Sequence, residues 1–110
     1  MPWQDGPIKK QFTEANLTEV LEQGERGTLS AYSHWQIVQW CHDYVEHWRA
    51  AGQLTPLAEL ADEVVVQWEL YLASHYTIYQ MQRFSQSDLL LPKEYFSQWL
   101  KDIDPVSCNH

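Results

Sequence analysis

The clearest amphipathic pattern covers residues 33–52. Ser33 and Gln36 form an S-x-x-Q capping box, which is typical of a helix start, and Gly52 ends the pattern. At about 100° per residue, one side of this segment is apolar. That side carries Ile37, Val38, Cys41, Tyr44, Val45 and Trp48. The pattern predicts a helix with one buried face.

A second helical pattern starts at Thr55 and Pro56, an N-cap followed by proline at the first helical position. No further glycine or proline occurs before Pro92. The side expected to face inward carries Leu57, Leu60, Ala61, Val64, Trp68, Tyr71, Leu72, His75, Ile78 and Tyr79. We expect one continuous helix from residue 56 to 85, about 45 Å long.

The same segment has a second apolar row about opposite the first. This row consists of Val66, Leu70, Ala73, Met81 and Phe84. A helix that is apolar on two faces is either central in its own bundle or shared with another chain. We therefore expect a homodimer around this helix. The alternative is a break near residues 74–77, after which the chain folds back and encloses both faces in a monomer.

Residues 66–72 also alternate as a strand would, but without a turn signal on either side we favour the helix. Asn16 and Glu19 resemble a capping box for a short first helix that stops at Gly24, and a last helix runs from Pro92 to Pro105. The prediction is an all-α bundle of about four helices. One helical domain would span residues 13–105, with an extended or flexible arm at 1–12 and a flexible tail at 106–110.

The chain has 15 acidic and 7 basic residues and a formal charge of −8. Nucleic-acid binding depends on clustered cations, so we expect no nucleic-acid partner, whereas a basic protein remains possible. We find no secretory signal pattern and no apolar run of the roughly 18 residues that cross a bilayer. We expect a cytoplasmic protein that does not enter membranes, with Cys41 and Cys108 as reduced thiols.

Three residues raise the question of chemistry, because His34, Cys41 and His75 all fall on apolar faces. Facing histidines in a bundle can hold a haem or a metal, and a Cys/His pair can support nucleophilic catalysis. Buried histidine and cysteine are more often neutral packing residues. We expect no bound cofactor or metal. The run of residues 42–47, with two histidines and two carboxylates, is interpreted as a solvated, pH-sensitive helix face.

These patterns favour a non-enzymatic interaction protein, such as an adaptor, assembly factor or inhibitor. Trp35 falls at the edge of the polar side of its helix, where it could anchor a partner or pack under the arm against Trp3 or Phe12. The side chains expected to be buried in the interaction are those of Val66, Leu70, Met81 and Phe84. The alternative is a bundle that binds a small molecule or cofactor between aromatic walls, with His34, His75 and Cys41 as its polar contacts. An enzyme completed by a partner subunit is a third option.

Overall fold

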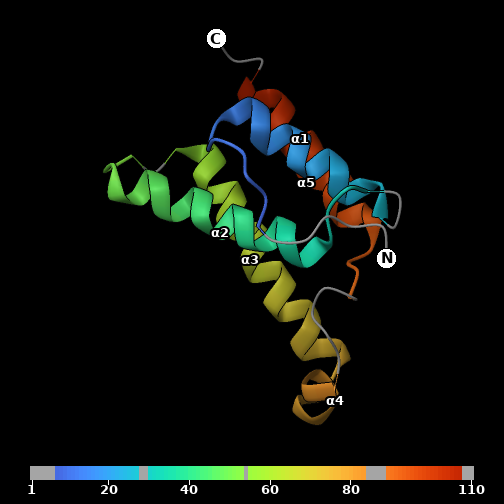
Figure 1. The fold of residues 1–110 in the computed structure, drawn as a ribbon. Coiled ribbons are helices and arrows are strands. Elements are labelled where there is room, and N and C mark those ends of the chain that lie inside the picture. Colours follow the sequence, from blue (N-terminus) through green and yellow to red (C-terminus); the bar gives the residue numbers. More distant parts are fainter. Residues whose placement is uncertain (1–6, 28–29, 54, 84–88, 108–110) are drawn as a thin grey trace.

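The computed structural model describes residues 7–27, 30–53, 55–83 and 89–107, and the side chains of this part as far as residue 103. Within these ranges the chain forms helices and no strand (Figure 1). The helices are α1 (Glu14–Glu25), α2 (His34–Ala50), α3 (Pro56–His75), α4 (Ile78–Arg83) and α5 (Lys93–Ser107). The predicted all-α class is confirmed, and residues 66–72 are helical rather than a strand.

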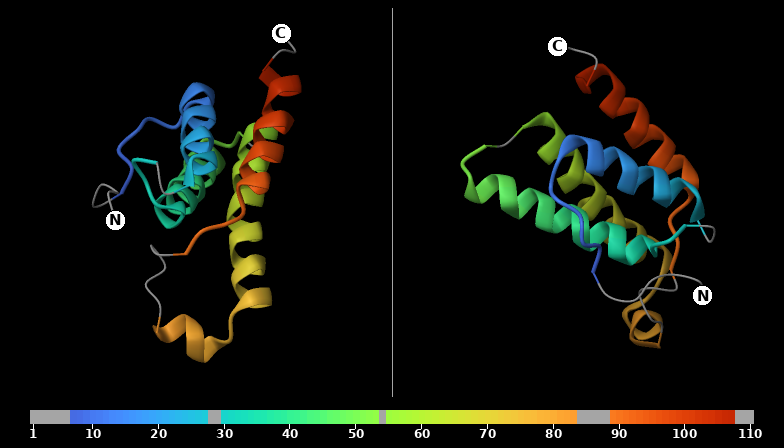
Figure 2. Two further views of the ribbon diagram at one scale, coloured as in Figure 1. Left: turned by 90° about the vertical axis from the view of Figure 1, so that its right-hand side faces the viewer. Right: turned by 45° about the horizontal axis from the view of Figure 1, so that its top comes forward.

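Four helices surround a single core. Helix α2 packs along α3, and α1 packs along α5, each pair running antiparallel (Figures 1 and 2). Contacts between α1 and α2 and between α3 and α5 join the two pairs. Helix α4 lies beyond the end of α3, away from α1, α2 and α5 (Figure 2). The molecule measures 45 × 27 × 25 Å along its principal axes, and α3 with α4 accounts for its tapered end.

Two of the predicted helix starts are confirmed. The Ser33 hydroxyl accepts a hydrogen bond from the Gln36 backbone N–H at 3.1 Å, and the Gln36 side chain accepts from the Ser33 N–H at 2.8 Å. The Thr55 hydroxyl accepts from the Ala58 N–H at 3.1 Å, with proline at the start of α3. These bonds satisfy backbone donors that the first helical turn leaves free.

The predicted limits of the first and last helices are wrong. Helix α1 is capped by Thr13, whose hydroxyl accepts from the Asn16 N–H at 3.2 Å, so it begins two residues before Asn16. It ends at Glu25, and the positive φ of 61° that follows a helix end belongs to Gly27. Helix α5 continues past Pro105 to Ser107, because a proline near a helix end removes only one backbone hydrogen bond.

Gly24 has a packing role rather than the predicted role of a helix stop. It lies buried in the last turn of α1, where a Cβ atom would clash with the Phe96 ring of α5. The absence of a side chain therefore lets α1 and α5 approach closely.

Gly24→Ala is expected to lower the free energy of unfolding by about 1–3 kcal/mol, because the added methyl group overpacks the α1–α5 contact. The same change in an ordinary helix interior stabilises the protein by about 0.5–1 kcal/mol. A decrease in the free energy of unfolding would therefore indicate the close contact between Gly24 and Phe96. Chemical denaturation measures the difference. In a Phe96→Leu background the alanine should cost less, and a gain in stability from Gly24→Ala alone would contradict the interpretation.

The predicted continuous helix over residues 56–85 is wrong. Helix α3 ends at His75, and Tyr76 is extended, with φ −134° and ψ 144°. Thr77 and Gln80 then form a second reciprocal cap: the Thr77 hydroxyl accepts from the Gln80 N–H at 3.1 Å, and the Gln80 side chain accepts from the Thr77 N–H at 2.9 Å. The alternative of a break near 74–77 is correct in position. Its second half is wrong, because Val66 and Leu70 stay 43% and 54% exposed.

The break also corrects the predicted inward stripe. From Leu57 to Leu72 the stripe packs inward as expected, whereas His75, Ile78 and Tyr79 are exposed. His75 is already exposed in the last turn of α3. Beyond it, the extended residue Tyr76 changes the direction of the chain, so the periodicity of α3 no longer applies to Ile78 and Tyr79.

Thr77→Ala combined with Gln80→Ala is expected to let α3 extend through residues 76 and 77. A capping box contributes about 1–2 kcal/mol to a helix start, so its loss favours the uninterrupted helix. Backbone Cα chemical shifts of Tyr76 report the change from extended to helical. Thr77→Ser keeps the capping hydroxyl and should keep the break, while an extended Tyr76 in the double variant would refute this account.

Residues 7–12 lie extended over α2 and are held there by side chains. Ile8 is buried, and the Trp40 indole N–H donates to the Lys10 carbonyl at 3.3 Å. The Phe12 ring lies 5.5 Å from that of Trp40 and 5.2 Å from that of His47. Phe12 therefore packs near the middle of α2 rather than on Trp35, and Trp3 lies outside the described residues.

Candidate functional site

An open groove of about 550 Å³ runs between α2 and α3. We call it the tryptophan groove. Helix α2 contributes one wall, α3 the other, and single residues of α4 and of the N-terminal segment complete the lining. The lining residues are Pro7, Trp35, Val38, Gln39, His42, Asp43, Val65, Trp68, Glu69, Leu72, Ala73 and Met81.

Two tryptophans define the apolar part of the groove. Trp35, in the first turn of α2, stacks on Trp68 of α3 with ring centroids 6.0 Å apart and an angle of 27° between the planes. Trp68, Val38 and Leu72 are buried and form the floor, whereas Trp35 is half-buried. Stacking fixes the orientation of the Trp35 ring, so its remaining surface is presented to the groove as a rigid apolar face.

The rim of the groove is polar and negatively charged. Gln39, His42 and Asp43 of α2 and Glu69 of α3 are exposed. The His42 ring lies 3.5 Å from the carboxylate of Asp43 and 4.0 Å from that of Glu46. The described lining contains two carboxylates but no lysine, arginine, serine, threonine or cysteine. The lining thus combines apolar area with negative charge.

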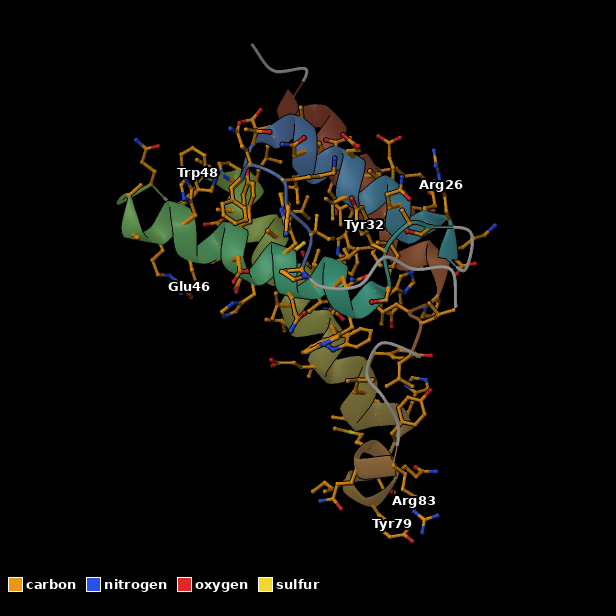
Figure 3. The ribbon with its side chains drawn as sticks, viewed as in Figure 1. Arg26, Tyr32, Glu46, Trp48, Tyr79 and Arg83 are labelled. Atoms are coloured by element: carbon orange, nitrogen blue, oxygen red, sulfur yellow. The ribbon has the colours of Figure 1, made fainter. Side chains whose placement is uncertain are left out.

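Four exposed apolar side chains of α3 and α4 lie outside the tryptophan groove, and we call them the outer row. Its members are Val66, Leu70, Ile78 and Tyr79, which are 43%, 54%, 76% and 62% exposed. Figure 3 shows Tyr79 and Arg83 of α4 near each other, and the Arg83 guanidinium lies 4.6 Å from the centre of the Tyr79 ring. Exposed apolar side chains that adjoin one another often mark interaction surfaces.

The predicted interaction residues divide between these two surfaces. Trp35 and Met81 both line the tryptophan groove. Val66 and Leu70 belong to the outer row, and Phe84 lies outside the described residues. The expected homodimer stays a prediction.

His34 is a buried structural residue. One ring nitrogen, Nε2, lies 2.8 Å from the Gly24 carbonyl of α1, and the other, Nδ1, accepts the Leu91 backbone N–H at 2.8 Å. These partners assign the proton to Nε2, so that Nε2–H donates to Gly24. Burial lowers the pKa of His34, which keeps the ring neutral. Both nitrogens are occupied, and the ring packs 4.5 Å from Phe96.

His75 and Cys41 lie in different surroundings from His34. His75 is exposed at the end of α3, where its ring stacks on Tyr71 at 4.1 Å. Cys41 is fully buried in α2, and burial raises the pKa of its thiol, which favours the unreactive protonated form. None of these three residues lines the tryptophan groove. The polar contacts proposed for a bound small molecule are therefore not brought together there.

The groove itself is not predicted by the sequence patterns. Trp68 and Leu72 were assigned to the core, which is correct, but their outer edges also form the groove floor. His42 and Asp43 were assigned to a solvated helix face, and both are exposed as expected. The usable signal was Trp35, a large ring at the edge of an apolar stripe, seven residues before a histidine on the same helix face.

Comparisons with protein-family models, with curated proteins and with solved structures gave no significant match. In the described part of the chain, no helix combines the length and the apolar character needed to cross a membrane. The described side chains also contain no group of three or more histidine, cysteine, aspartate or glutamate residues arranged to hold a metal ion. The function is therefore argued from the geometry of the groove.

Proposed function

We propose that this protein is a non-catalytic helical interaction module that binds a segment of another protein in the tryptophan groove. One observation carries the proposal: Trp35 stacks on a buried tryptophan and lines an open, mainly apolar groove. Rigid, partly buried tryptophans are the residue type most enriched among those that dominate binding energy. Trp35 is thus the anchor on this side of the interface, with Met81 beside it in the lining.

The charge of the chain supports a basic partner. The formal charge is −8, and Asp43 and Glu69 add carboxylates to the rim of the groove. A complementary partner surface is basic, because opposite potentials accelerate association and exclude acidic competitors. We therefore propose a basic segment of a protein as the occupant. The scarcity of clustered cations argues against nucleic acid.

A small molecule is the second candidate occupant, because about 550 Å³ falls within the usual range of ligand pockets. Its polar contacts in the groove would be His42, Asp43 and Glu69 rather than His34, Cys41 and His75. Ligand pockets normally bury most of a small molecule. Here the rim residues are themselves exposed, so a small molecule in the groove would stay partly in contact with water. A protein segment fits better, because the rest of the partner protein can cover the groove from the solvent side.

The proposal is tested with variants that fill the groove without disturbing the core. Ala73 is an exposed lining residue, so Ala73→Arg introduces a long side chain into the groove. Ala50→Arg places the same side chain on an exposed position at the end of α2, outside the groove, and is the matched control. Proteins captured from the native host by the wild-type chain and by each variant are identified by mass spectrometry. The binding of each purified candidate is then measured by calorimetry.

We expect at least one purified protein to bind the wild-type chain and Ala50→Arg with similar affinity and Ala73→Arg at least tenfold more weakly, a loss of about 1.4 kcal/mol. Equal binding to both variants by every candidate would overturn the proposal. A small molecule displaced by Ala73→Arg in native mass spectrometry would support the second candidate instead. Capture of the chain's own copies alone, sensitive to Ala73→Arg, would identify the occupant as a second copy.

A further inference from the structure

We infer that the segment bound in the tryptophan groove is an amphipathic α-helix whose apolar stripe is bordered by lysine or arginine. This inference rests on the proposed function and adds the conformation and chemistry of the partner segment. Three independent features of the groove carry it: the backbone chemistry of its walls, its length, and the placement of its charges.

The walls of the groove favour a helical occupant. Both walls are α-helices, and their backbone N–H and C=O groups are already paired along α2 and α3. An extended peptide would find no sheet edge here, since the described residues form no strand. Its backbone groups would lose water without gaining partners, which costs free energy for each group. A helix satisfies its own backbone, so it can enter an apolar groove with side chains alone.

The length of the groove fits two turns of helix. Trp35 and Asp43 are eight residues apart in α2, a rise of about 12 Å, and Val65 and Ala73 span the same distance in α3. Apolar side chains at positions i, i+3 or i+4, and i+7 of a bound helix cover about 10.5 Å. One such stripe therefore matches the floor, with one large side chain against the free face of Trp35.

The charges lie on the rim and not on the floor. Asp43 borders the groove on the α2 side and Glu69 on the α3 side, whereas Val38, Trp68 and Leu72 between them are apolar. A helix seated on this floor has its flanking positions beside the two carboxylates. Lysine or arginine at these positions gains a charge pair on each side, and glutamate there is repelled.

The test is a selection that leaves the partner chemistry open. A displayed library of random peptides of about 16 residues, or about four helical turns, is selected on the wild-type chain. Peptides that also bind Ala73→Arg or Trp35→Ala are removed at each round, so only groove binders are enriched. Ala73→Arg removes no buried contact, which keeps the selection informative if Trp35→Ala folds poorly.

We expect the enriched peptides to carry apolar residues at helical spacing, net positive charge and no internal proline. The best peptide, made synthetically, should become more helical by circular dichroism when bound. Asp43→Asn with Glu69→Gln should weaken it about tenfold, because each exposed charge pair contributes up to about a fivefold factor. Glu22→Gln with Asp102→Asn removes the same charge from exposed positions outside the groove and should change its affinity less than twofold.

Enriched peptides that are acidic or neutral, or that bind in an extended, proline-containing form, would overturn the inference and leave the proposed function standing. An equal loss of affinity with the rim pair and the control pair would also overturn it, since the charge effect would then be general. No enrichment over the groove variants would overturn the inference as well. The capture experiment with Ala73→Arg decides the proposed function separately, because it does not depend on peptide conformation.

Discussion

Replacing His34 with alanine should lower the free energy of unfolding by about 3–5 kcal/mol. The ring bridges three parts of the chain, because it bonds Gly24 at the end of α1, Leu91 just before α5, and belongs to α2 itself. Its removal leaves a buried carbonyl and a buried N–H without partners, each costing about 1–3 kcal/mol, and leaves a cavity beside Phe96. Urea or guanidinium denaturation measures the loss.

Partial replacements separate the two hydrogen bonds. Glutamine at position 34 can reach the Gly24 carbonyl but cannot accept from Leu91, and asparagine can do the reverse. Both variants should fall between wild type and alanine. His42→Ala, at an exposed position, should change stability by less than about 0.5 kcal/mol. If the alanine variant lost under about 1 kcal/mol, the bridging role would be refuted.

The same ring should make the fold sensitive to mild acid. Burial lowers the pKa of His34 in the folded protein, whereas in the unfolded chain it returns to about 6.5. Below pH 6.5 the unfolded state therefore binds more protons than the native state. The free energy of unfolding decreases as the pH is lowered from 6.5 to the lowered pKa of the folded protein. A single group contributes at most about 1.4 kcal/mol per pH unit.

Denaturation midpoints between pH 7.5 and pH 5 measure this dependence. His34→Gln should flatten the profile across that interval, because glutamine does not titrate. A His34→Gln profile as steep as that of the wild type would assign the acid sensitivity to other groups.

The architecture was predictable where local chemistry and periodicity agreed. The Ser33 and Thr55 caps and the apolar stripe of α2 each satisfy local hydrogen-bonding or burial requirements, and the structure confirms them. The all-α class followed from these segments. The role of Gly24 could not be predicted, because the residue that requires a glycine there is Phe96, 72 residues further along the chain. No local sequence pattern indicates such a close approach.

The break after α3 could have been found from the sequence. Thr77 and Gln80 have the same T/S-x-x-Q spacing that identified Ser33 and Gln36 as a helix start. No glycine or proline accompanies this spacing, and the apolar periodicity continues through Ile78, so both features favour a continuous helix. A capping box inside an apparently continuous helix is thus a stop signal, because its side chains satisfy backbone groups that a continuous helix would bond itself.

The candidate site was less accessible to sequence reasoning than the fold. Trp35 was identified from its place on one helix, but the groove needs α2 and α3 in register, and only the structure shows that Trp35 stacks on Trp68. Likewise, only the tertiary structure shows that His34 and His75 do not share a site. His34 was predicted to be a packing residue bonded within the fold, and its two backbone partners support that interpretation.

The last prediction separates the two tryptophans of the groove. Trp68 is among the largest fully buried side chains, so Trp68→Ala should cost about 3–5 kcal/mol of stability. Trp35 is half-buried, and Trp35→Ala should cost about 1–2 kcal/mol. Thermal and chemical denaturation measure both losses, with Trp68→Phe as an intermediate control because it keeps an aromatic ring in the core.

The two tryptophans should rank in the opposite order when the loss of binding affinity is compared with the loss of stability. Per unit of lost stability, Trp35→Ala should weaken a groove-bound partner more than Trp68→Phe, because Trp35 presents its free face to the partner while Trp68 forms the support beneath it. Calorimetry on folded samples of each variant gives the affinities. Equal losses of stability for the two alanine variants would place Trp35 in the core, and binding that follows stability alone would make its contribution structural. A divergence of the two measurements is expected because one ring is buried by the fold and the other is left for a partner.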